Sequence, residues 1–196
     1  MTEETAHAPV DLLEAALDLV AREGWEGYSP LALARETGSG LAEIVTQLGD
    51  RADIFAAMGR RADMAMIDVD VEDLAEMSVK ERVFELMMRR FESLRPARPA
   101  LQRLRREAAP EVWLEGLGNL RRAVKLVIDT AGLAAHGPRR AVVAAALAAA
   151  YLRTARVWLD DESEDLAATL AALDKQLDRV ADVLRSKPAA GPRATG

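Results

Sequence analysis

The side chains that most often carry catalysis are sparse in this 196-residue chain. It has no cysteine and only two histidines, His7 near the N-terminus and His136 in a predicted turn. The sequence therefore excludes a thiol nucleophile, a disulfide and a cysteine-ligated zinc site. It also lacks a glycine-rich phosphate loop and a histidine-based metal pattern. We expect a protein that is not an enzyme, with no catalytic residues, no metal and no cofactor.

Acidic residues gather in the segment 160–165, as Asp160-Asp161-Glu162 and Glu164-Asp165. Consecutive carboxylates can hold a cation. Directly before a predicted helix, however, they usually cap its first turn and face the positive end of its dipole. We interpret the cluster as caps.

A second group of residues suggests binding of an apolar ligand. Phe84, Met87, Met88 and Phe91 share one side of a predicted helix, and methionine adapts to irregular apolar shapes. An alanine-rich run at 141–150 would either let helices pack closely or leave room for a slender ligand. From the residues alone, a packed core and a pocket wall both remain open.

The basic residues gather in the middle of the chain. Residues 82–125 hold eleven basic and five acidic side chains, a net charge of +6, whereas residues 1–60 have a net charge of −7. The apolar helix that starts near Trp113 could be buried, or it could expose a face to a partner protein or a bilayer. We predict that this partner or membrane face consists of Trp113, Leu120, Arg121 and Ile128.

Helical periodicity runs through most of the sequence and predicts an all-α protein. Three short helices at 10–22, 30–36 and 41–48, and a longer one ending near 67, form a helix-turn-helix module. A capping box at Ser78 opens the larger part. The last helix, expected after a cap at Ser163, carries a leucine seam from Leu166 to Leu184. This seam would pack against the domain or contribute to a homodimer.

We predict a helix-turn-helix domain at 10–67, which is not expected to bind DNA, and a helical lipid-binding domain at 78–186. Residues 1–9 and 187–196 are expected to be disordered. The N-terminus lacks the features of a secretory signal or a transit peptide, and no stretch approaches the ~20 uncharged apolar residues of a membrane span. A cytoplasmic protein is the expectation.

The segment LLEAALDLVAREGWEGYSPLALARETG, Leu12 to Gly38, resembles the first two helices of TetR-like regulators. The resemblance implies a helix-turn-helix bundle followed by a larger helical ligand-binding bundle. The third helix departs from that pattern, because Val45 replaces the usual tyrosine and Gly49-Asp50 replaces the usual proline-serine pair. Only Arg51 keeps a phosphate-binding character, and phosphate contacts supply most non-specific DNA affinity.

Three further segments resemble the ubiquinone (coenzyme Q) biosynthesis accessory family of TetR-like lipid-binding proteins. They are AREGWEGYS at 21–29, ERVFELMMRRFESLRPARPALQRL at 81–104 and RTARVWLDDESEDLAATLAALDKQLDRV at 153–180. The resemblance implies a non-catalytic protein that presents isoprenoid quinone precursors to a hydroxylase. Implied partners are an isoprenoid lipid or phospholipid, that hydroxylase and the inner face of the cell membrane, with nucleic acid not expected.

Periodicity places the expected lipid-lining residues on several helices: Phe84, Met87, Met88, Phe91, Leu104, Leu117, Val124, Ala145 and Leu152. The alternative function is a TetR-family repressor that responds to a ligand and reads DNA as a dimer. A third possibility is an interaction protein without any ligand.

Overall fold

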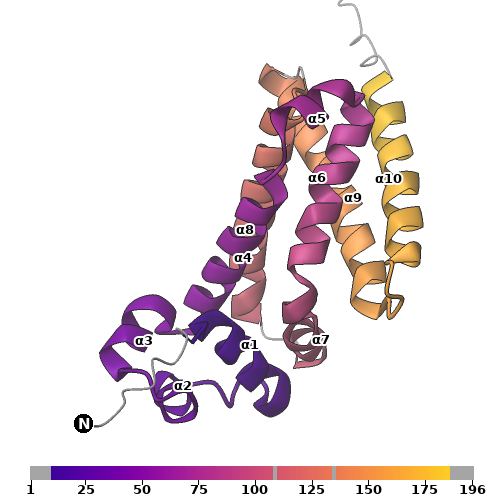
Figure 1. Ribbon diagram of the computed structural model, residues 1–196. Coiled ribbons are helices and arrows are strands. Elements are labelled where there is room, and N and C mark those ends of the chain that lie inside the picture. The colour runs from indigo at the N-terminus through magenta and orange to yellow at the C-terminus, as the bar shows by residue number, and fades with distance from the viewer. Residues whose placement is uncertain (1–9, 108–109, 134–135, 186–196) are drawn as a thin grey trace, which may run out of the picture. The chain divides into compact units, whose positions relative to one another are not determined.

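The computed structural model describes residues 10–107, 110–133 and 136–185, without the side chains of 110–115, 183 and 184. The two termini that were predicted to be disordered lie outside the described residues. Regular secondary structure in the described part is helical throughout (Figure 1). The elements are α1 (Leu12–Glu23), α2 (Pro30–Thr37), α3 (Leu41–Leu48), α4 (Arg51–Ile67), α5 (Val71–Glu76), α6 (Val79–Ser93), a 3-10 turn η1 (Arg95–Ala97), α7 (Arg98–Glu107), α8 (Pro110–Thr130), α9 (Gly137–Asp160) and α10 (Ala167–Arg185).

The described residues pack as two compact units. Among the described residues, the first unit comprises 10–68, 89–107 and 110–123, and the second comprises 69–88, 124–133 and 136–185, so that α6 and α8 contribute to both. These units do not follow the linear division at 10–67 and 78–186 that we expected, because residues 89–123 cluster with the N-terminal helices.

The helix-turn-helix in the first unit begins and ends at local signals in the sequence. The Asp11 carboxylate accepts hydrogen bonds from the first turn of α1, and the Ser29 hydroxyl accepts from Ala32 in α2. Asp50 and Asp53 form a capping box at the start of α4. Such bonds satisfy backbone N–H groups that lack partners inside the helix, so they fix where each helix starts.

Trp25 joins α1 to later parts of the first unit. Its ring stacks on Phe55 at 4.8 Å between centroids, its indole N–H donates to Ala100 O at 3.4 Å, and its backbone N–H donates to Glu107 at 3.0 Å. The preceding Gly24 has a φ of +82°, and a Cβ there would lie 2.5 Å from Glu107 Oε1. The Gly-Trp pair therefore serves the packing of α1 on α7.

A buried polar network also holds the first unit together. Asp63 of α4 accepts from Arg90 of α6 and, at 2.5 Å, from Arg122 Nε of α8. Arg122 donates to Asn119 Oδ1 at 2.9 Å, and Asn119 Nδ2 donates to Phe55 O at 2.8 Å. The network links three helices through partners that are far apart in the sequence.

In the second unit, α9 and α10 lie side by side (Figure 1). Their buried residues include Val143, Leu147 and Trp158 on α9, and Leu173 and Leu177 on α10. The buried leucines of the seam thus pack within the chain, which was one of the two roles that the sequence predicted for it. Contrary to the expectation, α10 begins at Ala167 rather than just after Ser163, and Leu166 precedes it with a φ of +54°.

Helix α5 was not anticipated from the sequence. It has only six residues and is capped by Asp70, whose carboxylate accepts from Glu72 N at 2.9 Å. Arg82 of α6 donates to Leu74 O at 2.7 Å and to Met77 O at 3.1 Å, so its guanidinium binds carbonyl groups at the end of α5.

Candidate functional site

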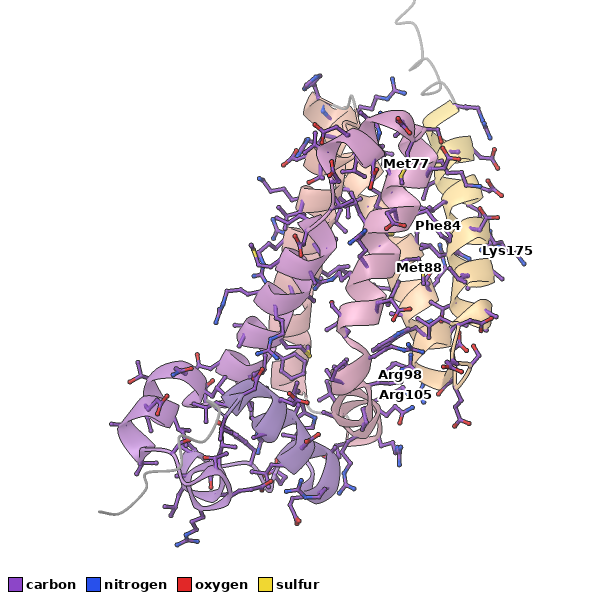
Figure 2. The ribbon with its side chains drawn as sticks, in the orientation of Figure 1. Met77, Phe84, Met88, Arg98, Arg105 and Lys175 are labelled. Atoms are coloured by element: carbon purple, nitrogen blue, oxygen red, sulfur yellow. The ribbon has the colours of Figure 1, made fainter. Side chains whose placement is uncertain are left out.

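A groove with a volume of 630 Å³ lies in the second unit. Its lining comes from α6, from the residue before it and from α10: Ser78, Lys80, Glu81, Phe84, Leu170, Ala171 and Asp174. Phe84, half-buried on α6, is the largest apolar side chain among them (Figure 2). The groove therefore combines an apolar centre from Phe84, Leu170 and Ala171 with a charged rim.

Local structure positions both walls of this groove. The Ser78–Glu81 capping box that starts α6 forms as predicted, with Ser78 N donating to Glu81 Oε2 at 2.7 Å. Lys80 then reaches α10, where its Nζ lies 2.7 Å from Asp174 and 2.6 Å from Asp178. Hydrogen bonds to Asp174 and Asp178 raise the pKa of Lys80, which keeps the cation at the rim.

One of the nine predicted lipid-lining residues, Phe84, lines this groove. Four others are buried in the protein: Met87, Met88, Phe91 and Val124. Leu104 is half-buried, whereas Leu117 and Leu152 are 54% and 47% exposed and Ala145 is exposed as well. Ala145 and Leu152 differ from the expectation of an interior lining because they project from the side of α9 opposite its buried residues. Leu117 shares the helix face of the buried Leu120 and Val124, but it lies further toward the N-terminal end of α8, where that face is exposed.

The predicted partner or membrane face on α8 is also corrected by the structure. Leu120 and Ile128 are buried, at 6% and 2% exposure, and Arg121 is exposed. The side chain of Trp113 lies outside the described residues. Periodicity located the apolar side of α8 correctly, but other parts of the fold cover it.

Sequence reasoning missed the partners of Phe84 in the groove. Lys80, Leu170 and Asp174 each look like ordinary helix-surface residues in the sequence. A lysine four residues before a phenylalanine gives no local signal that α10 will lie beside α6. The pairing of these two helices is a tertiary feature.

The acidic segment before α10 acts as a cap, in agreement with the sequence interpretation. Asp161 Oδ2 accepts from Thr169 N at 2.8 Å and from its hydroxyl at 2.7 Å, and Oδ1 accepts from the Ser163 hydroxyl. Burial alone would raise the pKa of Asp161, but the hydrogen bonds from Ser163 and Thr169 outweigh it and lower the pKa to about 2. Among the described residues, no cluster of three potential metal ligands is found.

The surface of α3, where a helix-turn-helix protein would read DNA, carries apolar and acidic groups. Leu41 and Val45 are 47% and 52% exposed, and Glu43 is exposed between them. Arg51, which kept a phosphate-binding character in the sequence, lies 3.0 Å from Glu26. The cation at the start of α4 is therefore engaged within the protein.

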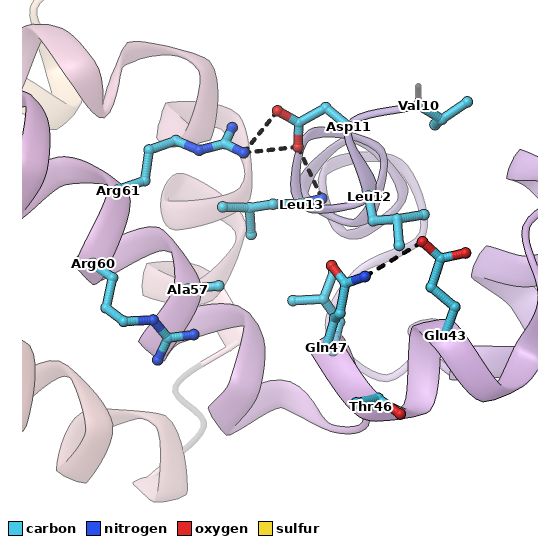
Figure 3. Close-up of a pocket in the computed structure, with 11 residues that line it drawn as sticks. Val10, Asp11, Leu12, Leu13, Glu43, Thr46, Gln47, Ala57, Arg60 and Arg61 are labelled. Carbon is cyan, nitrogen blue, oxygen red and sulfur yellow. Dashed lines mark hydrogen bonds and ion pairs between the residues drawn. The ribbon is translucent and has the colours of Figure 1, made fainter. Parts of the chain in front are cut away.

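A polar depression of 460 Å³ adjoins this helix, between the start of α1, α3 and α4 (Figure 3). Asp11 and Arg61 form an ion pair at 2.7 Å at one side, and Gln47 donates to Glu43 at 3.4 Å at the other (Figure 3). Arg60 also lines it. Its mixed charges suit neither a DNA backbone nor an apolar chain.

Buried Tyr28 lies near two carboxylates at the turn that precedes α4. Its hydroxyl donates to Leu48 O at the end of α3. Burial, and then the charges of Asp53 and Asp50, raise the pKa of Tyr28 to about 12. Negative charge thus surrounds the turn that precedes α4.

Comparison with known proteins gives one match to a family model and several to solved structures. Residues 126–184 match the COQ9 family model, a segment that contains the end of α8, all of α9 and almost all of α10. No curated protein sequence matches the chain. The protein is therefore COQ9-like in its C-terminal part.

The similar solved structures include TetR regulators. The TetR transcriptional regulator from Nitrosomonas europaea has a TM-score of 0.71 at 21% identity, over 87% of this chain and 95% of that chain. The TetR family regulator PfmR from Thermus thermophilus has a TM-score of 0.51 at 18% identity, over 86% and 98%. A protein of unknown function from a Rhodococcus species has a TM-score of 0.50 at 19% identity, over 91% and 98%. These likenesses confirm the predicted all-α, TetR-like fold.

Proposed function

We propose that this protein is a non-catalytic lipid-binding accessory protein of ubiquinone biosynthesis, which presents isoprenoid quinone precursors to a hydroxylase. The COQ9-like segment supports the pathway. The observation that carries lipid binding is the groove between α6 and α10, because its apolar centre at Phe84 is open to a ligand.

The groove offers different chemistry at its centre and its rim. Phe84 and Leu170 would contact the isoprenoid chain, since each buried CH₂ of such a chain contributes about 0.8 kcal/mol. Lys80 and Asp174 at the rim would face the polar ring. A ring held at the rim stays accessible to a partner enzyme while the chain is shielded from water.

A substitution in the groove tests this proposal. Phe84→Asp places a carboxylate at the apolar centre and should weaken binding of a soluble short-chain ubiquinone, measured by calorimetry, about tenfold or more. Leu117→Asp, at an exposed residue of α8 outside the groove, should bind like the wild type. Equal affinity of Phe84→Asp and the wild type would reject the groove as the site.

The second candidate is a TetR-type repressor, and the helix-turn-helix frame is the observation in its favour. The exposed Val45, the exposed Glu43 and the Arg51–Glu26 ion pair argue against it. We expect no retention on heparin or duplex DNA columns at low salt. Salt-dependent retention would support the repressor instead.

We also propose that the protein works in the cytoplasm, peripherally at the inner face of the cell membrane. A homodimer through the leucine seam of the last helix is less favoured, because Leu173, Leu177 and Val180 are buried in the single chain. A pure interaction protein without any ligand would bind no quinone in the calorimetric experiment.

A further inference from the structure

The groove at Phe84 is bordered by an excess of negative charge. Three of its lining residues are charged, namely Lys80 and Glu81 at the start of α6 and Asp174 on α10. Asp178, about one turn further along α10, also binds Lys80. One cation and three carboxylates give these four residues a net charge of −2. We call Lys80, Glu81, Asp174 and Asp178 the acidic rim.

The cation of the acidic rim is already engaged by the chain. Lys80 Nζ lies 2.7 Å from Asp174 Oδ1 and 2.6 Å from Asp178 Oδ1, so two carboxylates share one ammonium group. Among the described residues that line the groove, Lys80 is the only cation. Lys175 of α10 does not line it and points away from Phe84 (Figure 2). An anionic ligand would have to displace a carboxylate to reach Lys80.

Glu81 holds a second negative charge at the start of α6. Its carboxylate accepts from Ser78 N at 2.7 Å. The hydrogen bonds from Ser78 lower the pKa of Glu81, so this side chain is ionised at neutral pH. The positive end of the α6 dipole therefore already faces a carboxylate.

The start of α10, which supplies the other wall, is also occupied by groups of the chain. Ala167 N donates to the Ser163 hydroxyl at 3.1 Å and to Asp165 Oδ1 at 3.2 Å. Thr169 N donates to Asp161 Oδ2 at 2.8 Å. Both helices of the groove thus begin beside carboxylates, which compete with any anion for their positive ends.

These charges separate two classes of isoprenoid compound. A compound that carries a carboxylate or a diphosphate would bring like charge against the three carboxylates of the acidic rim, and such repulsion is a means of specificity. A neutral quinone or quinol ring can exchange hydrogen bonds with the same side chains without that repulsion. The apolar chain is the same in both classes, so the difference lies at the rim.

We propose that Asp174 and Asp178, together with Glu81, are specificity-determining residues that exclude anionic isoprenoid compounds from the groove and admit neutral aromatic ones. This inference rests on the proposed function and adds to it the charge class of the ligand. If Lys80, Asp174 and Asp178 served only to join α6 to α10, the charge of the ligand would make no difference to its affinity.

The test uses two ligands that differ only in charge, a geranyl-substituted benzoate and its methyl ester. Calorimetry with the full chain at low salt gives both affinities. The wild type should bind the neutral ester about fivefold more tightly or better, because the benzoate is repelled by the acidic rim. Added salt should narrow the difference, since Asp174 and Asp178 are 59% and 62% exposed and their charges are screened.

The variant Asp174→Asn/Asp178→Asn removes two charges and keeps the size of both side chains. It should bring the two affinities within about twofold of each other, mainly through tighter binding of the benzoate, because Lys80 can then pair with the ligand. A gain of affinity cannot arise from unfolding, so this result is independent of any loss of stability.

The matched control is Asp18→Asn/Glu23→Gln, which removes two exposed carboxylates of α1 that do not line the groove. It changes the net charge of the chain by the same amount and should keep the preference of the wild type for the ester. If the control lost that preference as well, the net charge of the chain and not the acidic rim would be responsible, and the proposal would be overturned.

Two further outcomes would overturn it. They are equal affinity of the wild type for the benzoate and the ester, and an unchanged preference in Asp174→Asn/Asp178→Asn. Both leave the lipid-binding function standing, because the ester is still bound. A wild type that bound neither compound would instead contradict the proposed function, so the two failures are distinguishable.

Discussion

At the scale of single residues, Gly59 of α4 illustrates how tightly the first unit is packed. A Cβ at this position would lie 2.5 Å from Cγ and Oδ1 of Asn119. The Asn119 side chain cannot turn away without losing its hydrogen bond to Phe55 O. We expect Gly59→Ala to lower the free energy of unfolding by about 1–3 kcal/mol, measured by urea denaturation.

Gly118 of α8 is the matched control, because a Cβ there would meet open space. Gly118→Ala should leave stability unchanged or raise it by up to about 1 kcal/mol, since alanine favours the helix. If both alanine variants lost the same stability, the close contact between Gly59 and Asn119 would be contradicted.

Asp63 is the second residue whose effect can be stated in advance. Its side chain is 5% exposed and lies between Arg90 and Arg122. Asp63→Ala removes the carboxylate that the buried Arg90 binds. We expect the free energy of unfolding to fall by about 3–5 kcal/mol, measured by thermal or urea denaturation.

The exposed Asp129, which pairs with Arg140 at 2.6 Å and Lys125 at 3.3 Å, provides the comparison. Asp129→Ala should have a much smaller effect on stability than Asp63→Ala, because water screens exposed pairs. If Asp63→Ala lowered the free energy of unfolding no more than Asp129→Ala, the result would argue against a buried polar network around Asp63.

The role of the Gly24-Trp25 pair is an example of a contact that could not be predicted from the sequence. The pair was visible as part of the family resemblance, but its role was not. The backbone N–H of Trp25 donates to Glu107, which lies 82 residues further along the chain. The hydrogen bond from Arg103, and then the one from Trp25 N, lowers the pKa of Glu107. No local pattern reports such a contact.

At the scale of helices, the sequence predicted boundaries where caps are local. The helices predicted at 10–22 and 30–36 agree closely with α1 and α2, and the helix predicted to end near 67 agrees with α4, because Gly24, Ser29 and Asp50 each bond within the adjacent turn. Two expectations at this scale failed: α5 is too short for periodicity to reveal, and α10 starts late. The Ser163 hydroxyl, expected as its cap, donates to Asp161 and accepts from Ala167 N.

The connection between α9 and α10 gives a pH-dependent prediction. The pKa of Asp161 is about 2 in the folded chain, below its ordinary 3.8. Its stabilising contribution is therefore complete above pH 3.8 and is lost as the pH falls through about 2. We expect Asp161→Asn to be less stable at neutral pH by about 1 kcal/mol or more, the usual effect of losing a cap.

Thermal unfolding between pH 2 and pH 5 measures this effect. The wild type should lose stability toward pH 2 more steeply than Asp161→Asn. Glu162→Gln, at the exposed neighbouring residue, is the control and should follow the wild type. Identical pH profiles for Asp161→Asn and the wild type would contradict the capping role.

At the scale of the whole molecule, periodicity identified apolar faces without showing which are covered. The apolar sides of α8 and α9 look alike in the sequence. In the structure, Leu120 and Ile128 are buried, whereas Val142 and Leu152 are exposed. Coverage depends on tertiary packing, and for that reason Leu120 and Ile128 of the expected membrane face are buried, and three of the nine expected lipid-lining residues, Leu117, Ala145 and Leu152, are exposed. The fold and the acidic helix-turn-helix could be predicted, because composition and charge are properties of the sequence itself.

The central claim is that this protein carries an isoprenoid lipid. The most direct measurement is mass spectrometry of organic extracts from the protein purified without detergent. We expect a polyprenyl quinone precursor in an amount comparable to that of the protein, and much less of it from Phe84→Asp than from Leu117→Asp. Extracts free of lipid would contradict a lipid carrier and would favour a repressor or an interaction protein without a ligand.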